Sequence, residues 1–393
     1  MLPLEGTKVL DLSQRAPGPL CTMVLADFGA EVVKIEAPQE AGISRAWSDL
    51  NLPLRERVYN PLHRNKKSMT LNLRADPGKE IFYKLSQGAD VILEGFRPGV
   101  AKRLGIDYES ISKINPRIVY CSLSGYGQDG PYSDLPGHDI NYISIAGALG
   151  MIGNSPDSPP AIPLNLVADF AGGSLHAVIG ILLALMARGK IGRGQYVDIA
   201  MIDGVISLLG FSTYEYFCFG RIPQRGDDML NGGFPCYNVY QTKDDGYISI
   251  GCVEAHFWEN LCRALGREDF IPYQWSQDKE KQEETFSFLR KTFLTKTRDE
   301  WFELLKNTVP TGKVYSMGEA FADPQVLHRK MMVEIDHPEA GKVKQIGIGI
   351  KLRETPGKIR SLAPSPGDHD EEILLSLGYT EQGIRSLRSK KVI

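Results

Sequence analysis

The order of secondary structure in the first 36 residues constrains the fold of this chain more than any other feature. Residues 8–12 are short, apolar and β-prone, and residues 31–36 form a second such stretch. Between them, Pro17 and Pro19 open a segment with one apolar face, and proline is well tolerated in the first turn of a helix. A strand–helix–strand unit pairs its strands in parallel and covers them with helices. We therefore predict an α/β fold.

The same alternation continues along the chain. It predicts strands at 69–73, 90–94, 117–123 and 195–198, a helix at 77–87 and a long apolar helix at 167–188. The first strand–helix turn lacks the GxGxxG pattern of dinucleotide-binding proteins. The pattern indicates a Rossmann-like domain with a parallel sheet, without support for a dinucleotide cofactor.

The pattern changes after residue 236. Residues 237–241 and 247–251 are typical of a β-hairpin around Asp244-Asp245-Gly246, and charged helices are predicted as far as residue 306. We predict a large domain over 1–200, completed by 333–393, a linker helix over 201–228, and a smaller α+β domain over 229–332.

Composition excludes several classes of protein. The 393 residues are 42% hydrophobic and 24% charged with a net charge of −3, which gives no overall attraction to nucleic acid or to an anionic membrane. Six cysteines without CxxC spacing argue against a zinc site and a disulfide framework. The longest apolar stretch, 175–186, is predicted to be too short to cross a bilayer. We expect a cytoplasmic protein with no metal and no nucleic-acid or membrane partner.

Three short motifs carry candidate chemistry. His138 lies in Gly137-His138-Asp139-Ile140-Asn141-Tyr142, Asp169 lies within 166–173, and Arg97 lies in a glycine- and proline-shaped turn at 94–100. An imidazole and a carboxylate are suited to proton transfer near neutral pH, and arginine is suited to phosphate. A lone histidine is more often structural and an aspartate more often caps a helix, so the pattern alone leaves both interpretations open.

The order and density of further motifs carry a family resemblance. These motifs, in order along nearly the whole chain, are Val9-Leu10-Asp11-Leu12, Ala16-Pro17-Gly18-Pro19, Leu25-Ala26-Asp27-Phe28-Gly29-Ala30, Asn65-Lys66-Lys67-Ser68, Ser122-Leu123-Ser124-Gly125-Tyr126-Gly127, Gly192-Arg193-Gly194-Gln195 and Phe321-Ala322-Asp323-Pro324-Gln325. In them the chain resembles the family III coenzyme A (CoA) transferases. Within that family, residues 137–142, 165–173 and 251–257 are similar to the 2-methylacyl-CoA racemase branch.

The resemblance implies an interlocked ring dimer. Each active site would lie between the large domain of one subunit and the small domain of the other. Glu254, in Gly251-Cys252-Val253-Glu254, would contact the catalytic histidine from the small domain. Acyl-CoA would be the substrate, so no separate cofactor is expected.

The resemblance leaves three alternatives for the function. In a racemase, His138 and Asp169 would remove and return the α-proton of a 2-methylacyl thioester from opposite faces, and Glu254 would orient the imidazole. Backbone N–H groups near Asp169 would anchor its carboxylate or polarise the thioester carbonyl. In a CoA transferase, Asp169 would instead form a mixed anhydride with the acyl group. A non-catalytic acyl-CoA binder is the third alternative.

The resemblance and the basic clusters together give the predicted ligand contacts. Alanine stands at position 37 where the family commonly has a phosphate-binding arginine, which makes other arginines the candidates. The basic run 64–67 is a further candidate. The predicted substrate- and CoA-binding residues are Arg15, Ala16, Ala37, Leu71, Asn72, Leu73, Arg74, Gly95, Phe96, Arg97, Arg103, Gly137, Asp139 and Tyr142.

Overall fold

The computed structural model describes residues 1–38 and 53–393, and these residues divide into two compact units. Unit 1 comprises Met1–Ala146, Leu164–Leu208 and Pro324–Ile393, and unit 2 comprises Gly147–Pro163 and Leu209–Asp323. Each unit has its own hydrophobic core. The α/β fold predicted for the first part of the chain is confirmed.

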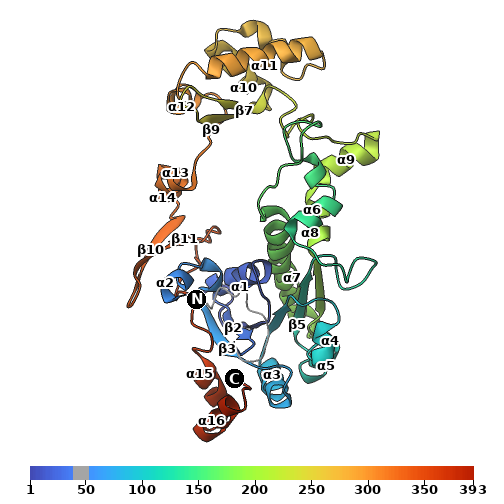
Figure 1. Ribbon diagram of the computed structural model, residues 1–393, viewed down its shortest axis with the longest axis vertical. Coiled ribbons are helices and arrows are strands. Elements are labelled where there is room, and N and C mark those ends of the chain that lie inside the picture. The colour runs from blue at the N-terminus through green and yellow to red at the C-terminus, as the bar shows by residue number, and fades with distance from the viewer. Residues whose placement is uncertain (39–52) are drawn as a thin grey trace. The chain divides into compact units, whose positions relative to one another are not determined.

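Unit 1 is built on a six-stranded parallel sheet with the strand order β3-β2-β1-β4-β5-β6 (Figure 1). This order reverses between β1 and β4, as it does in Rossmann-type sheets. The strands are β1 (Lys8–Asp11), β2 (Glu31–Glu36), β3 (Lys66–Thr70), β4 (Val91–Glu94), β5 (Val119–Ser124) and β6 (Tyr196–Ala200).

Helices cover both faces of this sheet because its strands are apolar on both sides. On one face, a core that includes Leu10, Ile92 and Phe82 packs beneath α3 (Asp76–Gln87), α5 (Tyr108–Ile114), α15 (Asp370–Ser376) and α16 (Glu381–Ser389). On the other, α1 (Pro17–Asp27) and α7 (His176–Ile191) pack side by side, as Figure 1 shows. Unit 1 also contains α2 (Leu54–Arg57), a short helix at Pro61–His63, α4 (Val100–Leu104), α6 (Asp139–Ile145), α8 (Met201–Leu208), α14 (Pro324–His328) and the hairpin β10 (Met332–His337) and β11 (Gly341–Ile346).

The strand predicted at 69–73 lies three residues earlier than expected. The sequence pattern pointed to the apolar residues Met69, Leu71 and Leu73, but pairing with β2 begins at Lys66. Lys66 is 3% exposed, and its ammonium group lies 3.2 Å from the Asp11 carboxylate. At position 66 the strand therefore carries a buried ion pair, where the apolar pattern used for the prediction requires an apolar side chain.

The long apolar helix is longer than predicted. A π-helical segment, η5 (Leu166–Leu175), runs directly into α7, so the helix is continuous from residue 166 to residue 191. These 26 residues are long and apolar enough to cross a bilayer, so the expectation that this stretch is too short was wrong. Core helices of soluble proteins pass the same test of length and composition, and 39% of the most apolar window is buried inside the protein.

Unit 2 contains a three-stranded antiparallel sheet, with β8 between β7 and β9. The predicted hairpin is confirmed at β7 (Tyr237–Gln241) and β8 (Tyr247–Gly251). The other elements are α9 (Gly210–Phe219), α10 (Ala255–Ala264), α11 (Lys279–Phe293), α12 (Arg298–Leu305), β9 (Thr311–Lys313), α13 (Met317–Ala322) and short helices at Leu149–Met151 and Glu268–Tyr273.

The division into units differs from the predicted domain boundaries at residues 324–332, which were predicted in the small domain but belong to unit 1, and at residues 147–163. We predicted this segment within the large domain, whereas it belongs to unit 2. The Arg225 guanidinium donates hydrogen bonds to the backbone carbonyls of Gly150, Pro156 and Ser158 at 3.0, 2.7 and 3.1 Å. One side chain thus binds the segment to a loop 70 residues away, which no local pattern reveals.

Candidate functional site

The predicted ligand contacts of unit 1 follow the carboxyl ends of its parallel strands. Arg15 and Ala16 follow β1, Ala37 follows β2, residues 71–74 follow β3, and residues 95–97 follow β4. His138 lies in the segment that leaves β5. Ligands of open α/β sheets bind at this edge, close to the point where the strand order reverses. The structure therefore brings these residues to the edge where the fold builds binding sites.

His138 is the residue immediately before α6, with an extended backbone conformation. Its own N–H donates to the Asn141 side-chain oxygen at 3.0 Å, which fixes the start of the helix. Its side chain is exposed, and Nε2 lies 3.4 Å from Nη1 of Arg15. The imidazole is thus held at an accessible position beside a guanidinium.

Asp139, the next residue, is buried and holds the helix that carries Asp169. Its Oδ2 accepts hydrogen bonds from the backbone N–H groups of Ala168 and Asp169, at 2.7 and 2.8 Å. The first N–H groups of a helix have no acceptor within the helix, so a carboxylate here satisfies two of them. These two N–H groups were expected to anchor the Asp169 carboxylate or to polarise the thioester, but they donate to Asp139 instead. The contact predicted between Asp139 and the substrate stays a prediction.

The Asp169 side chain is half-buried close to His138. Burial raises the pKa of its carboxyl above the usual range, while the Asn165 amide, which donates to Oδ2 at 3.2 Å, opposes that shift. The negative charge of Asp139 also raises the pKa, and His138 and Arg15 lower it. Four side chains from three segments therefore shift the pKa of one carboxyl group, as is common at catalytic sites.

A buried ionic network supports the loop that carries Arg15. Asp11 is fully buried and accepts hydrogen bonds from the backbone N–H of Ser13, at 2.9 Å, and from the Lys66 ammonium, at 3.2 Å. Burial opposes ionisation of Asp11, but Lys66, Lys34 and hydroxyl donors lower its pKa well below the usual range. The carboxylate therefore fixes the beginning of this loop in the folded protein.

Ser174 connects the other end of that loop to the helix of Asp169. Its hydroxyl lies 2.6 Å from the carbonyl oxygen of Pro17 and 3.0 Å from that of Asp169. The loop of Arg15 and the helix of Asp169 are thus joined at a fully buried side chain.

Tyr142 has a structural position behind the site. It is buried, and its hydroxyl donates to the Gly137 carbonyl at 2.6 Å. A Cβ atom at Gly137 would lie 2.6 Å from the tyrosine ring, so only glycine allows this approach. Burial raises the pKa of Tyr142 to about 12. Tyr142 therefore keeps its proton at neutral pH and fixes the backbone just before His138.

The remaining predicted ligand contacts differ in how accessible they are. Arg74, Gly95, Arg97 and Arg103 are exposed, whereas Leu71 is 1% exposed and belongs to the core. Leu71 can therefore offer a ligand its backbone but not its side chain. The half-buried residues are Ala16, Ala37, Asn72, Leu73 and Phe96.

The basic run at 64–67 does not supply free phosphate ligands. Arg64 is 1% exposed and forms a two-pronged pair with Asp27, Lys66 pairs with Asp11, and Lys67 contacts Glu31 and Glu372. These residues lie at the amino-terminal end of β3, opposite the ligand edge, because the strand starts earlier than predicted. Their charges are used in holding unit 1 together.

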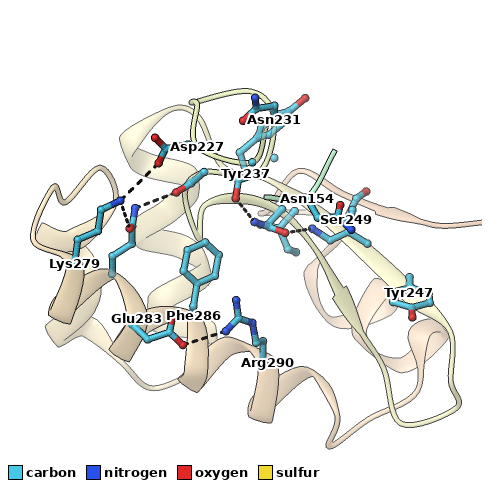
Figure 2. Close-up of a pocket in the computed structure, with 18 residues that line it drawn as sticks. Asn154, Asp227, Asn231, Tyr237, Tyr247, Ser249, Lys279, Glu283, Phe286 and Arg290 are labelled. Carbon is cyan, nitrogen blue, oxygen red and sulfur yellow. Dashed lines mark hydrogen bonds and ion pairs between the residues drawn. The ribbon is translucent and has the colours of Figure 1, made fainter. Parts of the chain in front are cut away.

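Glu254 belongs to unit 2, where it directly precedes α10 and is exposed. Near it in sequence, β8 lines a pocket of about 920 Å³ together with one face of α11 (Figure 2). In that pocket Arg290 pairs with Glu283, and Lys279 lies 3.6 Å from Asp227. Among residues 1–38 and 53–393, no group of three His, Cys, Asp or Glu side chains could hold a metal ion.

Sequence reasoning missed three residues of the site. Asn165 contacts Asp169, Ser174 joins two segments, and Glu94 is a buried carboxyl whose pKa burial raises to about 7. Glu94 ends the apolar strand β4, and Asn165 directly precedes the helix of Asp169, so a polar residue at the end of an apolar element was the available signal. Ser174 gave no signal, since its partners are distant backbone carbonyls.

The fold and the site define an α/β protein with an exposed imidazole and a half-buried carboxyl close to the carboxyl ends of its parallel strands. A family model described as "CoA-transferase family III" matches residues 4–370. The chain belongs to this enzyme family, as the sequence motifs indicated.

Characterised relatives include both activities considered above. The chain is 36% identical to the human alpha-methylacyl-CoA racemase, over 99% of this chain and 97% of that protein. It is 33% identical to the succinyl-CoA–D-citramalate CoA-transferase of Chloroflexus aurantiacus, over 100% and 98%. A crystal structure of a CAIB/BAIF family protein from Brucella suis matches with a TM-score of 0.80 and 29% identity, covering 96% and 99% of the two chains.

Proposed function

We propose that this protein racemises 2-methylacyl-CoA thioesters by removing the α-proton and returning one to the opposite face. The observation that carries the proposal is the link between the two bases. Asp139 follows His138 in the chain, and its carboxylate binds the backbone N–H of Asp169. An imidazole and a carboxyl of raised pKa are therefore held in a fixed relation at the ligand edge, as two-base proton transfer requires.

Each residue has a defined role in this proposal. His138 takes the α-proton from one face while the electron pair moves onto the thioester oxygen, and protonated Asp169 returns a proton to the other face. In the reverse direction the two bases exchange roles. The half-buried setting of Asp169 favours its protonated form, which keeps it available as an acid. In the interlocked dimer that the family resemblance implies, the Glu254 that orients the imidazole belongs to the second copy of the chain. Arg97, Arg103 and Arg74 hold the CoA phosphates.

Proton NMR in deuterium oxide tests the proposal. A single-enantiomer 2-methylacyl-CoA is incubated with the protein without any carboxylic acid acceptor. Loss of the α-proton signal with an intact thioester is expected, and His138→Ala should abolish it while CoA binding persists. His328→Ala, an exposed histidine on α14, is the matched control and should exchange like the wild type.

The second candidate is a CoA transferase, because relatives with that activity match the whole chain at 31–33% identity. In that reaction the Asp169 carboxylate attacks the acyl thioester, the C–S bond breaks, and an acyl-aspartyl anhydride forms as CoA thiolate leaves. CoA movement to an added acid without α-proton exchange would favour this alternative. Exchange without any acceptor would exclude it as the main activity.

We further propose that the working form is a homodimer, in the interlocked arrangement that the family resemblance implies. In the single chain, α7 exposes Ile179, Leu183 and Met186 at 53, 60 and 66% on one face. An exposed apolar face of this size is typical of an interface, and a second copy would cover it without a membrane. Light scattering of purified protein should give twice the mass of 43.6 kDa without detergent. A monomer, or protein recovered only in detergent, would contradict the proposal.

The proposed compartment is the cytoplasm. All six cysteines are free, and five of them are buried, which suits a reducing environment. Fractionation of cells that express the chain would test this, since recovery in the membrane fraction would contradict it.

A further inference from the structure

Arg15 has an unusual backbone conformation at a functional position. Its φ is +63°, in the left-handed region that residues with a side chain rarely adopt. A strained residue persists only where its surroundings determine it, and such residues cluster at functional sites. Here Asp11 fixes Ser13 on one side of Arg15, and Ser174 fixes Pro17 on the other. The fold thus holds Arg15 in a conformation that a free loop would leave.

The Arg15 guanidinium lies beside the imidazole of His138. Its Nη1 is 3.4 Å from Nε2 of the ring, and a guanidinium has only N–H donors to offer. The donor groups of Arg15 are therefore next to the nitrogen that takes the α-proton in the proposed reaction.

Other charged groups around His138 do not replace Arg15. The Asp139 carboxylate is used by two backbone N–H groups, and the Tyr142 hydroxyl is used by Gly137. Asp169 is the second base of the proposed reaction. Burial raises the pKa of Tyr142, and the positive charge of Arg97 opposes that shift. Within the part of the chain that the structure describes, the guanidinium of Arg15 is the cation in contact with the imidazole.

We propose that Arg15 is a further catalytic residue, which donates to the enolate oxygen of the thioester. This inference rests on the proposed racemisation. When the substrate binds, its α-carbon takes the place of the guanidinium at Nε2. The C–H bond breaks, the proton goes to Nε2, and the electron pair forms the C=C bond while the C=O becomes C–O⁻.

The charges that form in this step draw the Arg15 guanidinium from the imidazole toward the enolate oxygen. The imidazolium of His138 repels the guanidinium, while the new oxyanion, two bonds from the reacting carbon, attracts it. A donor aimed at charge that develops only in the transition state lowers the barrier without tightening ground-state binding. Arg15, predicted from the sequence as a CoA contact, is thereby assigned to the reacting centre.

Arg15→Leu and Arg15→Lys test the proposal, with Arg353→Leu as the control because the Arg353 side chain is 96% exposed. Arg15→Leu should lower kcat for α-proton exchange by about 10²–10³-fold, the usual effect of losing one oxyanion donor. Its KM should stay within about threefold, since ground-state binding is not affected. Arg15→Lys should recover part of kcat, and Arg353→Leu should match the wild type.

The outcomes separate this inference from the proposed function. Exchange by the wild type with an unchanged kcat in Arg15→Leu would overturn the role of Arg15 and leave racemisation standing. Absence of exchange in the wild type would overturn racemisation and the enolate role of Arg15 together.

Discussion

Asp139→Ala removes the carboxylate that ties the histidine segment to the Asp169 helix. Two buried N–H groups, of Ala168 and Asp169, would lose their acceptor. Each unsatisfied buried donor costs about 1–3 kcal/mol, so the free energy of unfolding should fall by about 2–6 kcal/mol. Because a misplacement of about 1 Å at a reacting group can cost about 10²-fold in rate, α-proton exchange should fall by at least that factor.

Asp139→Asn separates the hydrogen bonds from the charge. The asparagine oxygen can still accept both N–H groups, so the loss of stability should be smaller than in Asp139→Ala. Removing the negative charge lowers the pKa of Asp169, because Asp139 is one of the groups that raise it. The acid side of the pH profile of exchange should therefore move to lower pH.

Urea unfolding followed by circular dichroism, together with the deuterium exchange assay, gives both quantities. Asp134→Ala is the matched control, because Asp134 is exposed and has no hydrogen bond or ion pair among the described residues. Equal urea midpoints and equal exchange rates for the wild type and Asp139→Ala would refute the reasoning.

Three further predictions concern stability and assembly. Burial raises the pKa of Glu94 from 4.5 to about 7, so the native state binds more protons than the unfolded state between these pH values. The free energy of unfolding should therefore fall by about 3 kcal/mol as pH rises from about 4.5 to 7. Glu94→Gln should remove most of this pH dependence in urea titrations, and an unchanged pH dependence would contradict the prediction. Lys66→Met removes the ion-pair partner of the buried Asp11 charge and should cost about 3–5 kcal/mol, while adding Asp11→Asn should recover part of that loss in the same titrations. Leu183→Asp should convert the proposed dimer to monomer or aggregate by light scattering, and an intact dimer would place the interface elsewhere.

The sequence predicted much of the fold because its signals are local. The strand–helix–strand unit of residues 8–36 and the hairpin at 237–251 depend on apolar periodicity and turn residues, which are visible within a short window. Where the prediction failed, a distant partner was decisive. β3 begins at Lys66 because Asp11 pairs with it, and residues 147–163 join unit 2 because Arg225 binds their carbonyls.

The sequence by itself determined the family and named His138 and Asp169, because a motif consists of residue identities and their order along the chain. Only the tertiary structure decided how those residues are held. It assigned Asp139 to backbone N–H groups and the run 64–67 to ion pairs, and it placed Arg15 on the imidazole. The physical reason is that hydrogen bonding and charge pairing depend on which groups meet in space. A sequence shows which donors and acceptors exist, but the fold alone decides which of them are already occupied.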